Sequence, residues 1–316
     1  MRSAKLSTVK DCEVIFAHDH SVILSGKNPW LFRDHGSFVE KYKSIRHAFS
    51  MLFLPGNTAF LDGWMDQSYH FISLDTGELL WSHVQKGRRD FTPRIFTSTA
   101  DGNIVYYVYS IKNILHVDQL VLPEKSCITY TIPFSMGATY HCYCDERGYL
   151  CMLQSFLLPK EQEDSKECRF FGVLQWHPDD QNPTWKYQWT VPTGTPDCSV
   201  CTCNDEYVLL GNLKVRNLKT GEMFYILENQ KEQLPLFGGY SVTAYDKERN
   251  LLTIRFTWSS SNVIIDCASR TIVAHYVPFD DDHVGGCLIG DEFWIGSKNG
   301  VVKRDFPYID PFPRKL

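Results

Sequence analysis

The chain lacks the features that mark membrane-spanning and exported proteins. No run approaches the roughly 18 consecutive apolar residues that a transmembrane helix needs. The opening residues, MRSAKLSTVKDCEV, have a basic flank but no apolar core, so they do not resemble a signal peptide. The net charge of −5 and the isoelectric point near 6.1 argue against a general binder of nucleic acid or anionic membranes. We therefore expect a cytoplasmic monomer that binds neither nucleic acid nor membrane.

Catalytic motifs are also missing. No serine stands in a Gly-x-Ser-x-Gly elbow. The glycine pair Gly238-Gly239 precedes a strand-like segment, whereas a phosphate-binding loop would lead into a helix. Apolar residues recur with a period near 2, and no long segment keeps the helical period of 3.6. The sequence thus predicts an all-β protein, with no catalytic residue, cofactor or metal assigned.

The chain has eleven cysteines, and we expect them to stay reduced in the absence of an export signal. Cys198, Cys201 and Cys203 form one cluster, and Cys142 and Cys144 a second, with Cys151 nearby. Such clusters can hold a soft metal, and that alternative stays open. Both clusters fall on predicted innermost strands, where sheets converge and small residues are needed. The favoured interpretation is therefore packing, because a buried cysteine behaves as a small hydrophobe.

Aromatic residues are abundant, at 14% of the chain, and suit half-buried pleated surfaces. Seven times, at a period of about 45 residues, two runs of β-formers flank a polar turn, a repeat size typical of a propeller blade. We predict a single domain, residues 1–316, with the fold of a seven-bladed β-propeller; six or eight blades are the alternatives. The predicted first hairpins are Cys12–Gly26, His47–Gly63, Phe96–Tyr109, Tyr140–Met152, Cys198–Gly211, Ser241–Phe256 and Gly286–Gly296.

Six further turns should join the third and fourth strands of the blades. The predicted turns lie at residues 34–36, 75–77, 123–125, 179–182, 219–221 and 267–269. The seventh blade has three recognisable strands, at Gly286–Gly290, Glu292–Lys298 and Val301–Asp305, followed by a proline-rich tail that makes a poor fourth strand. We expect the N-terminal segment Ala4–Lys10 to pair with residues 301–305 and close the ring.

Two outer hairpins carry a family resemblance. The run LDTGELLW at residues 74–81 resembles the outer hairpin of the PQQ-like (quinoprotein-type) repeat, and NLKTGEMFYI at 217–226 is a looser copy. WD-repeat and related propellers use similar hairpins. The resemblance implies the fold. It does not imply the cofactor, because the chain has no adjacent Cys-Cys pair, which quinoprotein dehydrogenases use.

Other polar clusters are interpreted as turns and connectors. His18-Asp19-His20 falls on the first hairpin, where Asp and His are common, so turn chemistry is favoured over a metal site. Asp280, Asp281 and Asp282 with His283 lack the glycine-punctuated spacing of a calcium loop and are favoured as a solvated connector. The charged run at 159–167 is favoured as a solvated hairpin tip.

The leading hypothesis for function is a non-enzymatic binding module, a protein- or peptide-interaction scaffold that uses one face of the propeller. The alternative is a carbohydrate-binding protein or an enzyme with a site at the axial mouth of the ring. Blade connectors and the hairpins between second and third strands emerge on one face, and exposed aromatics and Arg there suit recognition. The candidate residues of that face are Trp64, Asp66, Arg88, Arg89, Tyr240, Trp258, Asp282, His283 and Lys298.

Overall fold

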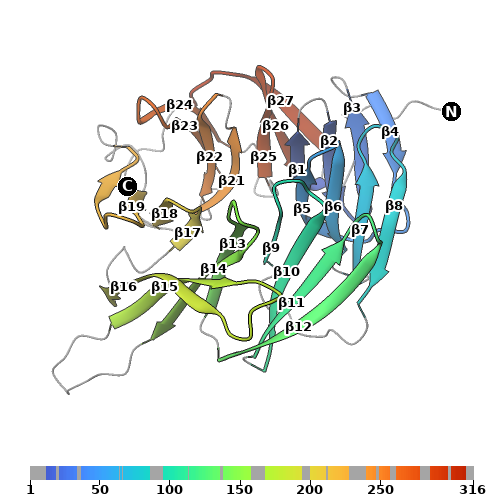
Figure 1. Ribbon diagram of the computed structural model, residues 1–316. Helices are drawn as coiled ribbons and strands as arrows, with labels where there is room; N and C mark the ends of the chain where they lie inside the picture. The colour runs from blue at the N-terminus through green and yellow to red at the C-terminus, as the bar shows by residue number, and fades with distance from the viewer. Residues whose placement is uncertain are drawn as a thin grey trace. The chain divides into compact units, whose positions relative to one another are not determined.

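The computed structural model describes residues 12–310, with gaps at 19–20, 34–36, 64, 66, 86–94, 113, 136–137, 158–167, 194–199, 211–212, 228–239, 247–248, 257–260, 278–284 and 298–299. The described residues form 27 strands and contain no helix. These strands build seven antiparallel sheets, six with four strands and one with three (Figure 1). In every sheet, strands consecutive in the chain are neighbours. The predicted fold class, an all-β seven-bladed β-propeller, is confirmed.

The chain falls into two compact units. Unit 1 comprises Met1–Phe53, Asn57–Arg88 and Leu227–Leu316, and unit 2 comprises Leu54–Gly56 and Arg89–Ile226. The expectation of a single domain stays a prediction.

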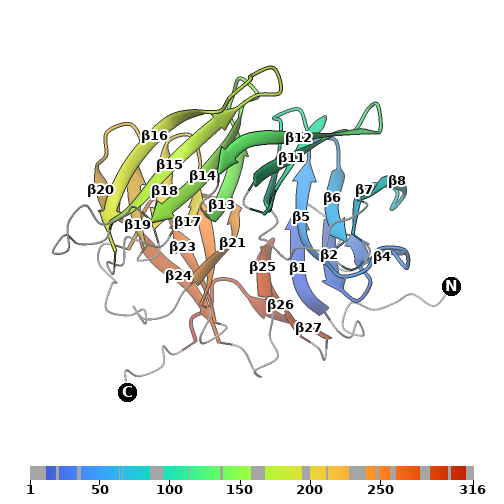
Figure 2. The same cartoon turned by 90° about the horizontal axis from the view of Figure 1, so that it is seen from below.

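The sheets of unit 1 are built as follows. The first contains β1 (Cys12–His18), β2 (Ser21–Gly26), β3 (Trp30–Arg33) and β4 (Ser37–Lys41). The second contains β5 (Ala48–Leu54), β6 (Thr58–Gly63), β7 (Ser68–Ser73) and β8 (Leu79–Val84). The sixth contains β21 (Tyr240–Asp246), β22 (Leu251–Phe256), β23 (Asn262–Asp266) and β24 (Thr271–Tyr276). The seventh contains β25 (Gly285–Ile289), β26 (Glu292–Ser297) and β27 (Gly300–Asp305), shown from below in Figure 2.

The three sheets of unit 2 follow the same order. The third contains β9 (Ile95–Ser98), β10 (Ile104–Ile111), β11 (Ile114–Val121) and β12 (Ser126–Ser135). The fourth contains β13 (Ala138–Cys144), β14 (Leu150–Leu157), β15 (Cys168–Trp176) and β16 (Thr184–Pro192). The fifth contains β17 (Val200–Cys203), β18 (Tyr207–Leu210), β19 (Lys214–Asn217) and β20 (Met223–Tyr225).

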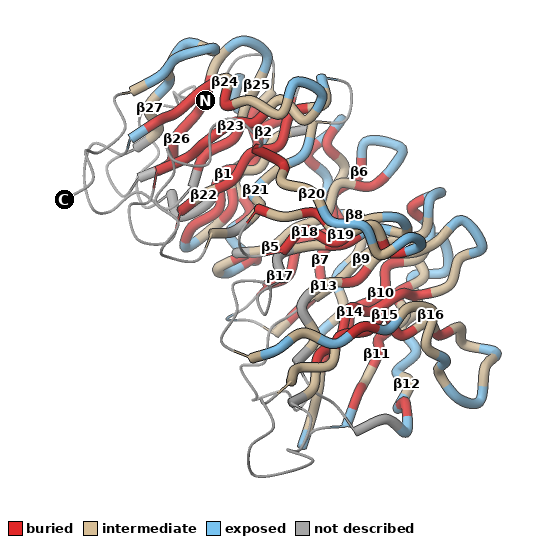
Figure 3. Tube along the Cα trace, turned by 90° about the vertical axis from the view of Figure 1, so that its left-hand side faces the viewer, coloured by how far each residue is buried: buried red, intermediate tan, exposed pale blue. Residues whose placement is uncertain are grey.

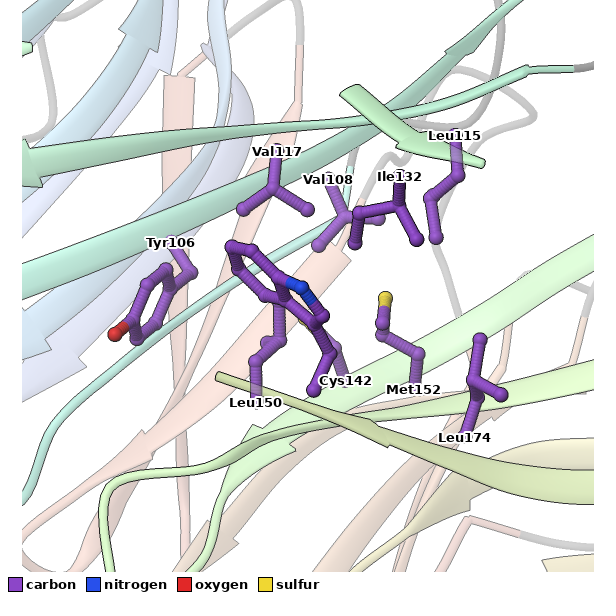
Figure 4. Close-up of a cluster of buried hydrophobic side chains, with 10 residues drawn as sticks. Tyr106, Val108, Leu115, Val117, Ile132, Cys142, Leu150, Met152 and Leu174 are labelled. Carbon is purple, nitrogen blue, oxygen red and sulfur yellow. The ribbon is translucent and has the colours of Figure 1, made fainter. Parts of the chain in front are cut away.

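In the first and second sheets, burial falls from the middle strands to the outer strand. All residues of β2 and of β6 are buried, whereas the outer strands β4 and β8 are largely exposed or half-buried (Figure 3). β2 packs against the second sheet through Ile23 and against the seventh through Val22 and Leu24, so both sets of its alternating side chains must be apolar. In unit 2, Leu115 and Val117 of the third sheet pack against Leu150 and Leu174 of the fourth (Figure 4). The core is therefore a series of layers between adjacent sheets.

The predicted turns between third and fourth strands are confirmed wherever the structure describes them. In the turn at 75–77, the Gly77 amide donates to the Ser73 carbonyl at 2.9 Å, and Gly77 has a φ of +75°. Gly221 repeats both features, donating to the Asn217 carbonyl at 2.9 Å with a φ of +76°. Only glycine adopts this backbone without strain, which is why the same Thr-Gly-Glu triplet recurs. The turn predicted at 34–36 lies outside the described residues.

Among the described residues, the seventh sheet ends at β27, as predicted from the proline-rich sequence behind it. The chain then turns back, and the Asp310 amide donates to the carbonyl of His275 in β24. The segment Ala4–Lys10, predicted to pair with β27, lies outside the described residues, so ring closure stays a prediction.

A close approach at Gly286 gives a test of sheet packing in unit 1. A Cβ at this position would lie 2.6 Å from the Phe293 ring and 2.9 Å from the Trp294 carbonyl. The Phe293 ring is fully buried and stacks on Tyr276, with centroids 4.2 Å apart. We expect Gly286→Ala to lower the free energy of unfolding by about 2 kcal/mol, measured by urea denaturation. The double variant with Phe293→Leu should lose less than the sum of the two single changes; additive losses would show that the ring is not the obstacle.

Candidate functional site

A cavity of about 820 Å³ opens in unit 1 where the first strands of its four sheets end. Four strand segments line it, from β1, β5, β21 and β25, together with residues of β22 and of two turns. Each first strand ends here in the turn to its second strand, so residues far apart in the chain meet at one place. The lining residues are Ile15, Phe16, Ala17, Met51, Leu52, Phe53, Thr243, Ala244, Tyr245, Asp246, Arg249, Leu251, Thr253, Cys287, Leu288, Ile289 and Gly290.

Most of the cavity wall is apolar. Phe16, Met51, Phe53 and Leu288 are half-buried, so their side chains keep part of their surface at the cavity. Tyr245 is 55% exposed, which is high for an aromatic residue on a strand. Aromatic and thioether groups give large contact areas that adapt to ligand shape. The wall is therefore suited to an apolar ligand group.

The polar groups of the cavity gather at the turn between β21 and β22. The Arg249 Nε donates to the Asp246 carboxylate at 2.6 Å, and its Nη1 donates to the Gly290 carbonyl at 2.7 Å. The Tyr245 hydroxyl donates to the Asn250 side chain at 2.8 Å. Asn250 has a φ of +55°, a conformation that Asn tolerates better than most residues. Arg249 therefore joins the turn of the sixth sheet to that of the seventh. Its charge is paired with that of Asp246 in the same turn.

The hydroxyl of Thr243 completes the polar part of the wall. It donates to the backbone carbonyl of Thr253 at 3.3 Å. Among the described residues that line the cavity, Asp246 and Arg249 carry the only charges, and none is a histidine. The arrangement can hold a ligand by contact area and a few hydrogen bonds.

Of the residues predicted for a binding face, the structure describes only Tyr240. Tyr240 begins β21, and its ring meets the Phe256 ring edge-on at 6.3 Å between centroids. The cavity lies at the opposite end of the same strand, so Tyr240 is not part of it. The other predicted face residues lie outside the described residues: Trp64, Asp66, Arg88, Arg89, Trp258, Asp282, His283 and Lys298. The same holds for Asp19, His20, Asp280, Asp281 and the run at 159–167.

The cysteine clusters in unit 2 pack as predicted, as far as they are described. Cys142, Cys151 and Cys203 are buried within the hydrophobic layers on either side of the fourth sheet. Burial raises the pKa of all three thiols, that of Cys151 to about 12. A thiol with a raised pKa is a poor nucleophile and a poor metal ligand. The described residues hold no group of three or more His, Cys, Asp or Glu side chains that could bind a metal ion.

Two half-buried polar groups of unit 2 were not predicted. Burial lowers the pKa of His141 to about 4, so its imidazole is neutral at pH 7, with Nε2 3.4 Å from the Thr202 hydroxyl. Lys186 Nζ lies 3.0 Å from an Asp145 carboxylate oxygen and 2.6 Å from one of Asp205. Both aspartates stand in first-hairpin turns, of the fourth and fifth sheets. Lys186 thus joins the two sheets, and both carboxylates are paired with its ammonium group.

The described residues include no helix long and apolar enough to cross a membrane.

Comparison with known proteins gives the fold. No family model matches the sequence, and no curated protein matches it. Among solved structures, virginiamycin B lyase from Staphylococcus aureus is similar with a TM-score of 0.60 and 12% sequence identity, over 96% of this chain and 97% of the other. The computationally designed Ika8 protein is similar with a TM-score of 0.54 and 11% identity, over the same shares of the two chains. At such low identity these similarities establish the fold alone.

Proposed function

We propose that the protein is a non-enzymatic binding module that receives an apolar side chain of a peptide or protein partner in the unit 1 cavity. The observation that carries this proposal is the composition of the described cavity wall. Aromatic, aliphatic and thioether side chains surround a single ion pair, Asp246–Arg249, whose partners satisfy each other. The volume of about 820 Å³ falls within the range of ligand pockets, so it accommodates more than a single small side chain.

The alternative is carbohydrate binding at the same place. Tyr245 presents its ring at the surface, and the Thr243 hydroxyl lies near it on the same strand. Rings of this kind also stack on sugar faces. The low identity to the lyase carries no activity over to this chain, and Asp246 is held by Arg249 rather than aimed at the cavity as a lone acid.

We also propose that the chain is a divergent propeller of the PQQ-like kind that works as a monomer in the cytoplasm. The equivalent hydrogen bonds at Gly77 and Gly221 support the shared repeat. The buried, weakly acidic thiols of Cys142 and Cys203 are compatible with a reducing compartment.

The proposal predicts that filling the cavity abolishes peptide binding. Peptides are selected from a displayed random library against the wild-type protein and then tested on two variants. Thr243→Trp places a large ring in the cavity, whereas Leu79→Trp places one on β8, where Leu79 is 39% exposed outside it. We expect Thr243→Trp to weaken binding at least about tenfold and Leu79→Trp to leave it unchanged.

Two results would contradict this function. Selected peptides that bind both variants as tightly as the wild type would place recognition elsewhere. The carbohydrate alternative would be favoured by another result: the library yields no binder, whereas free sugars bind the wild-type protein and fail to bind Thr243→Trp.

A further inference from the structure

The outer edge of β24 carries an extended segment of the same chain, residues 306–310. The His275 amide donates to the Tyr308 carbonyl at 2.9 Å, and the Asp310 amide donates to the His275 carbonyl at 2.9 Å. His275 and Ile309 thereby form a parallel bridge. In a parallel pair of strands, one residue makes main-chain hydrogen bonds to two residues of the neighbouring strand, as His275 does here. The segment is thus added to the edge of the sheet like a further strand. We call residues 306–310 the strap.

Side chains of the strap fix its register on β24. The Asp310 carboxylate accepts a hydrogen bond from the Val277 amide at 2.8 Å, just beyond the end of β24. The Nδ1 of His275 lies 2.9 Å from the Asp310 carbonyl. The Tyr308 ring stacks on Tyr276, with centroids 6.3 Å apart. An aromatic residue and an aspartate, two positions apart, thus hold the strap at one place.

The outer part of the strap lies at the surface, whereas Phe306 at its start is half-buried and packs against the cluster of Tyr276 and Phe293. Tyr308 is 40% exposed, Ile309 is 53% exposed, and Val277 beside them is 37% exposed. His275 itself is only 2% exposed, but hydrogen bonds made by exposed residues such as Tyr308 open locally at low free-energy cost. The covalent tether raises the effective concentration of the strap to the order of millimolar, so a separate segment must compete with it. The outer edge of β24 can therefore pair with an extended segment, and a competing segment can replace the strap.

We propose that the outer edge of β24 is a peptide-binding edge, occupied here by the strap, that binds a partner protein through an extended aromatic-aliphatic-aspartate segment. The site shares no residue with the cavity wall, whose Arg249 lies over the Phe306 ring at 6.0 Å, and it does not depend on the function proposed for the cavity. The partner segment takes the place of Tyr308, Ile309 and Asp310, and main-chain bonds to His275 give it its register.

The test uses the full chain with a weakened strap. The double variant Tyr308→Ala/Asp310→Ala removes the ring contact and the acceptor of the Val277 amide. The probe is a synthetic peptide with the sequence of residues 305–311, DFPYIDP. We expect the peptide to bind the double variant at least about tenfold more tightly than the wild type, because the tethered competitor is weakened. Hydrogen exchange should show the His275 and Val277 amides unprotected in the variant and protected again when the peptide is added.

Controls separate this edge from nonspecific binding. A peptide with Asn in place of the aspartate should bind about tenfold more weakly, because a charge-assisted acceptor is lost. The variant Glu222→Ala/Met223→Ala, at the start of another outer strand, should bind the peptide no better than the wild type. Equal binding of the peptide to the double variant and the wild type would overturn the proposal. A stable dimer of the double variant that excludes the peptide would also overturn it, since the occupant would then be a second copy.

Discussion

Replacing Lys186 with Met should lower the free energy of unfolding by about 3 kcal/mol, the range for a buried charge left without its partner. The Lys186 ammonium bridges Asp145 and Asp205, and the Asp145 side chain is only 5% exposed. In the variant, the Asp145 carboxylate stays buried without its counter-ion. Two sheets of unit 2 also lose the bridge between their turns.

The same substitution should change how stability depends on acid. Burial by itself raises the pKa of Asp145, but hydrogen bonds from Lys186 and from the Tyr149 and Arg147 amides outweigh it, so its pKa lies below the ordinary value. Stability from such a group is present above the unfolded-state pKa, about 3.9, and is lost as the pH falls through the folded-state pKa. The gap between wild type and Lys186→Met should therefore be constant from about pH 5 to 7 and shrink below about pH 4.

Urea denaturation at several pH values measures both effects. Arg33→Met is the matched control, because the Arg33–Asp75 pair is exposed, and it should cost no more than about 1 kcal/mol. The Lys186 bridge would contribute little if Lys186→Met lowered the free energy of unfolding no more than Arg33→Met does. The same would follow if the difference in this free energy between wild type and Lys186→Met did not change with pH.

Deleting residues 1–10 should cost several kcal/mol, on the scale of a lost strand ladder and its packing. Among the residues that the structure describes, β27 pairs with β26 alone, whereas the other six sheets have four strands. β1 itself lies beside this sheet, because Val301 of β27 packs against a cluster that includes Ile15 of β1. A free edge also promotes association between molecules.

Thermal denaturation and light scattering test this deletion. The truncated chain should melt at a lower temperature and aggregate, while deletion of residues 312–316 should leave the melting temperature unchanged. A monomeric truncated protein with the melting temperature of the full chain would show that the sheet is completed in another way.

The turns and strands of this protein were predictable because their signals are local. One glycine in each of the turns Asp75-Thr76-Gly77 and Lys219-Thr220-Gly221 indicates the backbone conformation of the turn. The alternation of apolar and polar residues on either side indicates the strands. The burial of Cys142 and Cys151 followed from their place on inner strands.

The cavity could not be predicted, because no local pattern marks it. Its wall joins residues such as Phe16, Met51, Tyr245 and Leu288, each ordinary in its own strand, and only the packing of four sheets brings them together. Lys186 lies among aromatic residues of a strand, with no neighbouring charge in the sequence to indicate its partners. The strap could not be recognised in the sequence either. Pro307 and Pro311 indicate a proline-rich tail, although the residues between them make main-chain hydrogen bonds to β24.

Methyl resonances of the methionines give the most direct test of binding at the cavity. With methyl-labelled Met, the signal of Met51 reports on the cavity wall. That of Met65, which is 57% exposed, reports on the face where Trp64 and Asp66 were predicted to bind. Met223, on the outer strand β20, serves as the internal control. A peptide selected against the wild-type protein should shift the Met51 signal at the concentration at which it binds and leave those of Met65 and Met223 in place. A shift of Met65 with Met51 unchanged would contradict the account.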